Sequence, residues 1–191
     1  NQSGWISSIH RVLNRTDFRE TDRAVSLLPP WHAFERGVEY ASVSVGLDFL
    51  FSRITDLRHD LAEFQPTIFP SVPRIWETVY NGILTNLRNQ STVARIVFEL
   101  FLSVGVLWAR HRAVVGGYDP QVERPFPLLA LLKRTWSLVM LLILSPLKFL
   151  SRFVFRRIHA ALGGRLRVSL SGGSAQPTVV DRVLQAIGIP V

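Results

Sequence analysis

Residues 165–175 predict a strand, a tight turn and the start of a helix: Arg165-Leu166-Arg167-Val168-Ser169-Leu170-Ser171-Gly172-Gly173-Ser174-Ala175. Apolar and polar side chains alternate up to Leu170, as they do in a half-buried strand. The two glycines end that strand, and the apolar residues of 178–187 recur at helical spacing. Small residues in such a turn let a flat ring or a phosphate approach the backbone, and the next helix presents free N–H groups. The segment is not a P-loop, because no Gly-Lys-Ser/Thr follows it.

Strands alternate with helices through the rest of the chain. We expect short buried strands at 24–28, 47–51 and 67–69, and helices over 33–45, 56–64, 75–87 and 93–108. This alternation predicts an α/β fold, a layered parallel sheet with flanking helices.

We expect three parts along the chain: an α/β part over 1–90, an all-helical insertion over 91–162, and the strand-turn-helix over 163–191. A further helix is expected over 1–14. Two helices should fill 128–162, broken near Ser145-Pro146, because proline cannot continue a helix without loss.

Composition excludes several classes of protein. Hydrophobic residues make up 48% of the 191 residues, which excludes a disordered tail, and the absence of Cys excludes disulfides, Cys-based zinc sites and a Cys nucleophile. The net charge of +8 is uneven: residues 1–123 have 12 Arg and 13 acidic residues, whereas residues 124–191 have 10 Lys and Arg and only Asp181. The excess of positive charge therefore lies in the last third of the chain. Its cations alternate with aliphatic rather than stacking aromatic side chains, so we expect no nucleic-acid partner.

The basic segment 125–158 has two interpretations. Residues 135–147 hold no charge and are flanked by cations on both sides, at Lys133, Arg134, Lys148, Arg152, Arg156 and Arg157. Thirteen uncharged residues are too few to span a bilayer, which needs about 20. Such a segment fits a helix that lies on a membrane surface and meets anionic lipid, and it fits equally a buried helix with a solvated basic flank.

Histidine spacing supports no local metal site, since none of the five histidines lies at metal-ligand spacing from another. His32 differs from the others because it follows a predicted strand directly. Ligands gather outside the carboxyl ends of strands in open α/β sheets. His32 is therefore a candidate site residue, the alternative being a histidine at a helix start that Glu35 or the backbone satisfies.

Four stretches taken together resemble the adenylate-forming long-chain fatty acid ligases: residues 26–36 (Ser-Leu-Leu-Pro-Pro-Trp-His-Ala-Phe-Glu-Arg), residues 65–77, residues 162–167 and residues 171–175. The first is similar to the form found in the plastid and cyanobacterial acyl-carrier-protein ligase branch. The resemblance covers nearly the whole chain and rests on the joint pattern of the four stretches.

This resemblance implies an activity and its cofactors. The family uses ATP and Mg²⁺ to activate a fatty acid to an acyl-adenylate, and then transfers the acyl group to a thiol of coenzyme A or acyl carrier protein. We therefore expect a long-chain fatty acid as substrate and, through 125–158, a membrane surface as partner. The implied location is cytoplasmic and peripheral on the inner membrane face. It is in a plastid or a bacterium if the chain belongs to the acyl-carrier-protein ligase branch.

The resemblance also implies roles for individual residues. His32 matches the residue that closes over the carboxylate and the α-phosphate, with Trp31 packed beside it, and its donor would stabilise charge at phosphorus. The turn that lies against adenine corresponds to Gly172, Gly173, Ser174 and Ala175. The acyl tunnel corresponds to Val72, Pro73 and Arg74, and Arg36 falls where some relatives have a tunnel-gating aromatic residue.

Other parts of the family pattern are expected outside this sequence. The phosphate loop should precede Asn1, and the Tyr-Gly-x-Thr-Glu motif, whose Glu helps to hold Mg²⁺, should follow Val191. The chain is then expected to be an internal segment of the large N-terminal domain, inactive in adenylation by itself. A non-catalytic α/β module that binds a membrane surface or a protein partner remains the alternative.

Overall fold

The computed structural model describes residues 4, 6, 7, 9, 10, 13, 16–29, 31–117 and 126–189. Its elements follow one another as β1 (Arg23–Ser26), α2 (Ala33–Val45), β2 (Asp48–Phe51), α3 (Leu57–Phe64), β3 (Ile68–Ser71), α4 (Pro73–Arg88), α5 (Thr92–Gly116), α6 (Pro127–Ala161), β4 (Val168–Ser171) and α7 (Thr178–Ile187). The predicted helix over 1–14 lies largely outside the described residues.

The four strands form one parallel sheet in the order β2-β1-β3-β4, which confirms the predicted fold class. Strand β3 ends opposite the end of β4, because Ser71 pairs with Ser171. Each parallel connection contains at least one helix, as crossovers between parallel strands require. All four carboxyl ends consequently lie at one edge of the sheet.

Alternate residues of each strand enter opposite layers. Val25 and Phe69 pack into a cluster with Trp76 of α4 and Leu184 of α7. Their neighbours Ala24 and Ile68 enter the other cluster, together with Val38 and Ala41 of α2 and Phe18. The two layers explain why these strands read as nearly continuous apolar runs in the sequence.

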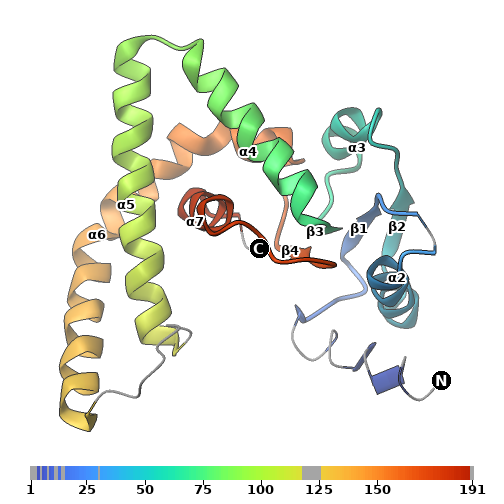
Figure 1. Ribbon diagram of the computed structural model, residues 1–191, viewed down its shortest axis with the longest axis horizontal. Helices are drawn as coiled ribbons and strands as arrows, with labels where there is room; N and C mark the ends of the chain where they lie inside the picture. Colours follow the sequence, from blue (N-terminus) through green and yellow to red (C-terminus); the bar gives the residue numbers. More distant parts are fainter. Residues whose placement is uncertain are drawn as a thin grey trace.

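Helices α5 and α6 pack against each other and stand away from the sheet, with α7 between them and the strands (Figure 1). His111 Nδ1 and Ser137 Oγ link the pair across 3.1 Å. The two helices bury few of their residues, mostly small ones such as Gly105 and Ser151, and expose large apolar side chains such as Leu142 (74% exposed). Within the described residues both helices are long and apolar enough to cross a membrane.

The predicted break at Ser145-Pro146 is wrong, because α6 is one helix that contains Pro146. A proline inside a helix leaves the carbonyl four residues before it without its usual donor. The Ser145 hydroxyl donates to that carbonyl, Leu142 O, at 2.9 Å. Figure 1 shows α6 bending partway along its length, the effect that an internal proline has on a continuous helix.

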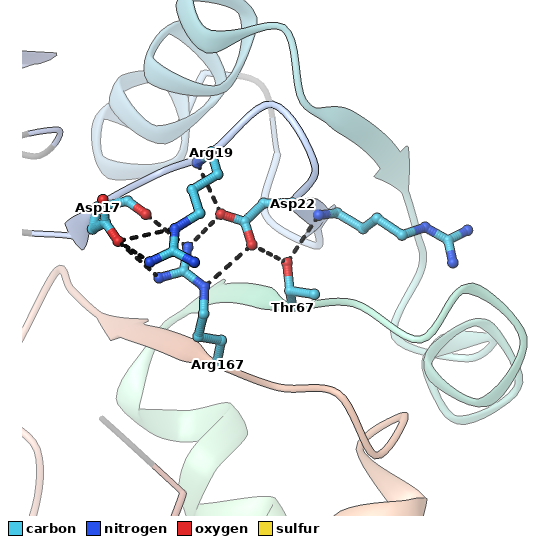
Figure 2. Close-up of polar contacts among 6 residues, drawn as sticks. Asp17, Arg19, Asp22, Thr67 and Arg167 are labelled. Atoms are coloured by element: carbon cyan, nitrogen blue, oxygen red, sulfur yellow. Dashed lines mark hydrogen bonds and ion pairs between the residues drawn. The ribbon is translucent and has the colours of Figure 1, made fainter.

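A buried carboxylate joins three strands at the amino edge of the sheet (Figure 2). Asp22, which precedes β1 and is 4% exposed, accepts hydrogen bonds from the Arg167 guanidinium and, at 2.7 Å, from the Thr67 hydroxyl. The backbone N–H of Arg19 donates to it at 2.9 Å. Arg167 and Thr67 lie just before β4 and β3, so one side chain fixes the starts of three strands.

Burial alone would raise the pKa of Asp22, but the hydrogen bonds from Arg167, Thr67 and Arg19 outweigh it and hold that pKa below its ordinary value. A carboxyl group with a lowered pKa stabilises the fold above its unfolded pKa. That contribution is lost as the pH falls through the folded pKa.

We expect the substitution Arg167→Met to lower the free energy of unfolding at pH 7 by about 3 kcal/mol, because it leaves a buried carboxylate without its charged partner. Urea unfolding measures the loss, and the deficit should shrink at pH 3.5 as Asp22 takes up a proton. The control is Arg165→Met, at an exposed position two residues away. An equal loss in both variants, or a deficit that does not change with pH, would contradict this role for Asp22.

Candidate functional site

Three serines end three neighbouring strands at the carboxyl edge of the sheet. Ser26, Ser71 and Ser171 are the last residues of β1, β3 and β4. Each hydroxyl is buried and has no hydrogen-bond partner among the described residues. Buried polar atoms in proteins nearly always have a partner, so this edge has polar groups available to a ligand.

The segment after β1 and the turn after β4 meet above these strand ends. A Cβ atom built on Gly173 would lie 3.6 Å from His32 Cε1 and 3.8 Å from Val72 Cγ1. The backbone of His32 is held at both sides, since its N–H donates to Pro29 O at 2.8 Å and its carbonyl accepts from Arg36 N at 3.0 Å. The structure thus brings His32, Val72 and Gly173 into one corner.

The turn needs glycine at two positions for different reasons. Gly172 lies under the Phe34 ring, and a Cβ there would be 2.4 Å from that ring. Gly173 has φ +89°, in the left-handed region that side chains avoid. The Gly172 N–H donates to Ser71 O at 3.1 Å, so the start of the turn is tied to β3.

More unpartnered polar atoms lie on the two segments that form this corner. Among the residues that the structure describes, none forms a hydrogen bond with the buried Nδ1 of His32 or with the two amide atoms of Gln176, the residue that follows Ser174 and Ala175. These groups can donate to a polar ligand or accept from one. The corner therefore combines an imidazole, an amide and a flat backbone surface.

Glu35 is a fully buried carboxyl group in the first turn of α2, and its polar neighbours are the Ser26 side chain and the Leu27 backbone. Burial raises its pKa to about 7, and the nearby charge of Glu39 adds to the effect. The neighbouring polar groups of Ser26 and Leu27 offset only part of this rise. Glu35 is therefore close to half protonated at neutral pH.

The remaining predicted site residues are more dispersed. Trp31 is 80% exposed. The Arg36 guanidinium lies 6.0 Å from the centre of the Tyr40 ring on the surface of α2. Val72 and Pro73 begin α4, with Pro73 buried and Arg74 exposed. Ser174 and Ala175 are exposed in the turn itself.

No cluster of three or more His, Asp or Glu side chains able to hold a metal ion occurs among the residues that the structure describes. Gly172, Gly173 and His32 could flank a planar ring or a phosphate. They offer no carboxylate for a cation.

Several residues of this edge were not predicted as site residues from the sequence. The three strand-end serines had a usable signal, since each follows an apolar run at the position where ligands gather. Glu35 and Gln176 had no such signal, because residue type alone does not distinguish a buried acid or amide from an exposed one.

Comparison with known proteins places this sequence in a family. The sequence matches the family described as AMP-binding enzyme over residues 2–191. It is 30% identical over 189 residues to a probable chloroplastic acyl-activating enzyme 16 of Arabidopsis thaliana, covering 96% of this chain and 26% of that protein. It is 29% identical over 171 residues to a chloroplastic long-chain-fatty-acid–acyl-carrier-protein ligase of the same plant, covering 88% and 23%.

A long-chain-fatty-acid–CoA ligase of Mycobacterium tuberculosis is 29% identical over 196 residues, which covers 100% of this chain and 28% of that protein. The chain thus spans about a quarter of the length of these relatives. No solved structure gives a significant match. The match over almost every residue shows that the chain belongs to the AMP-binding enzyme family.

Proposed function

We propose that this chain forms part of the nucleotide site of an ATP-dependent long-chain fatty acid ligase. In that reaction the fatty acid carboxylate attacks the α-phosphorus of ATP, pyrophosphate leaves, and an acyl-adenylate forms. A thiol then attacks the acyl carbon and AMP leaves. Relatives named as fatty acid ligases for acyl carrier protein and for CoA support this assignment.

One observation supports the proposal above all others: His32 and Gly173 lie together at the carboxyl edge of a parallel sheet. Nucleotides and other ligands bind in this position in open α/β sheets. The two residues are 141 positions apart in the sequence, so only the fold brings an imidazole to a glycine turn here.

His32 is proposed as the donor that stabilises negative charge as the carboxylate and the α-phosphate react. A preorganised donor aimed at developing charge is the largest single contribution in many enzymes. The fixed backbone of His32 meets the need for preorganisation, and its unpartnered ring nitrogen leaves it free to bind substrate.

The turn of Gly172, Gly173, Ser174 and Ala175 is proposed as the surface that adenine lies against. Its small side chains leave the backbone open, as contact with a flat ring requires. The acyl chain is proposed to run past Val72, Pro73 and Arg74, with Trp31 and Arg36 near the tunnel entrance. The position of Val72, whose Cγ1 would lie 3.8 Å from a Cβ added at Gly173, supports a tunnel that starts there.

ATP in this reaction is expected to bind with Mg²⁺. The described residues provide no cluster of ligands that fits this metal ion.

The acceptor thiol is proposed to be coenzyme A or acyl carrier protein, because the named relatives divide between the two. Supplying each thiol in turn to the preformed acyl-adenylate distinguishes them, since only the true acceptor releases AMP rapidly.

In the full-length enzyme that contains this chain, we expect His32→Ala to slow fatty-acid-dependent pyrophosphate release about a hundredfold, the effect of removing one charge-stabilising donor. The matched control is His59→Ala, an exposed histidine on α3. An unchanged rate in His32→Ala would remove His32 from the mechanism. A wild-type enzyme that releases no pyrophosphate with any fatty acid would sink the ligase assignment.

Gly173→Ala should raise the KM for ATP by about tenfold, because its methyl group would occupy the space between the turn and His32. The control is Gly46→Ala, which has a similar φ of +80° but nothing within 4 Å of the added Cβ. Both variants should lose similar stability in thermal unfolding, and only Gly173→Ala should bind ATP less well. Equal KM values for the two would contradict contact between this turn and the nucleotide.

We also propose that α5 and α6 attach the protein to the surface of an anionic membrane. The exposed apolar side chains of α6, such as Leu142 and Ile143, lie between the cationic ends of the uncharged stretch 135–147. Both helices are long and apolar enough to cross a membrane. The uncharged stretch of α6, however, is about 20 Å long at 1.5 Å per residue, shorter than the roughly 30 Å hydrocarbon core, so a spanning α6 would bring flanking cations into that core. The arrangement supports a helix pair that lies in the headgroup boundary, peripheral on the inner face of a plastid or bacterial membrane.

Reversing the charge at Arg152, Arg156 and Arg157 to Glu should abolish flotation with vesicles that contain about a third anionic lipid, because those exposed arginines would then repel the surface. Reversing Arg53, Arg58 and Arg182, which are exposed on other elements, is the matched control. Flotation that survives the first set of changes would refute electrostatic attachment. Flotation without any pyrophosphate release by the wild type would favour a non-catalytic membrane-surface module.

A further inference from the structure

The shape of the proposed adenine turn depends on where α7 lies. The turn begins at Ser171, which the sheet fixes through its pairing with Ser71. It ends at Thr178, the first residue of α7. Six residues join these two points, so a shift of α7 relative to the sheet must change the path of Gly172 and Gly173.

Side chains of α6 provide hydrogen bonds to carbonyl groups at the carboxyl end of α7. A helix leaves its last four carbonyls without partners, and here these belong to residues 184–187. Backbone N–H groups of Gly188 and Ile189 donate to the first two of these carbonyls. Lys148 Nζ donates to Ala186 O at 2.6 Å, and His159 Nε2 lies 3.1 Å from Ile187 O.

These two contacts come from a cation and an imidazole on one helix. A carbonyl oxygen can only accept, so His159 Nε2 is the ring nitrogen that has the hydrogen. A positive charge at a helix carboxyl end also interacts favourably with the helix dipole. All four terminal carbonyls of α7 are thereby satisfied, two of them from α6.

Helix α5 meets the same end of α7 by direct backbone contact. A Cβ atom built on Gly105 would lie 2.3 Å from Ala186 O, so the helices touch where any larger residue would force them apart. Val180, Leu184 and Ile187 of α7 face the core shared with Phe155 of α6. Helices α5 and α6 thus hold α7 at one end, and the glycine turn is at the other.

We infer that Lys148 and His159 are positioning residues for the nucleotide turn, acting through α7. This inference rests on the proposed ligase function, and it adds a role for two side chains that lie far from the reacting atoms. Without the two contacts, α7 would keep its apolar packing but lose the hydrogen bonds that set its position along its own axis. The turn would then hold adenine less well, while the chemistry at His32 would be affected little.

The test uses the full-length enzyme that contains this chain, with pyrophosphate release measured against ATP concentration. Lys148→Met and His159→Leu should each raise the KM for ATP about tenfold, equivalent to about 1.4 kcal/mol, with kcat within about twofold of wild type. His159→Gln, which keeps a side-chain N–H donor, should recover most of the loss. The matched control is Arg182→Met, which removes a cation from an exposed side chain of α7 itself.

Amide hydrogen exchange supplies a readout that does not depend on activity. In Lys148→Met the amides of 172–176 should exchange at least tenfold faster than in wild type, while those of β1 and β3 remain unchanged. An unchanged turn, or the same change in Arg182→Met, would overturn the inference. If wild type releases no pyrophosphate the ligase function fails, and faster exchange confined to the turn would still support positioning by Lys148.

Discussion

The buried carboxylate of Asp22 is the constraint on which the arrangement of the sheet depends. It meets Arg167 across 145 positions of sequence, and the long α5–α6 pair lies within that interval. Closing so large a loop costs conformational entropy, although the cost grows only slowly with length. Charged hydrogen bonds at the amino edge, together with the pairing of β3 with β4, offset that cost and bring the glycine turn close to His32, in the segment that follows β1.

The two edges of the sheet consequently differ in whether their buried polar groups have hydrogen-bond partners. At the amino edge Asp22 has partners on both carboxylate oxygens, as a folding contact requires. At the carboxyl edge the serine hydroxyls, His32 Nδ1 and the Gln176 amide have none among the described residues. A polar group left without a partner in this way lowers stability, and proteins keep such groups mainly where something else binds.

The sequence was informative where the signal is local and failed where the partner is distant. Apolar runs predicted all four strands to within a few residues, and the glycines at 172 and 173 predicted the turn. The break at Pro146 was wrong because the Ser145 hydroxyl replaces the missing donor, a compensation that the proline rule does not include. The pairing of Asp22 with Arg167 and the contacts of Lys148 and His159 with α7 lie outside any local pattern. Their partners are 28 to 145 residues away.

The site shows the same division. His32 and the turn could be selected from the sequence because each follows a strand. Their placement, so close that a Cβ added at Gly173 would contact the imidazole, is a property of the sheet order. Trp31 is exposed because few other residues of the fold cover it, and the residues next to it in the sequence do not reveal this.

Glu35 has a consequence for how the molecule exchanges protons with its surroundings. Its pKa rises from 4.5 to about 7 in the folded chain, so between these values the folded molecule holds a proton that the unfolded chain has released. Its contribution to stability is complete below pH 4.5 and declines as the pH rises towards 7, the reverse of the behaviour of Asp22. Unfolding near pH 6 therefore releases close to one proton from Glu35 of α2. Mildly acidic pH consequently stabilises the packing of that helix on the sheet.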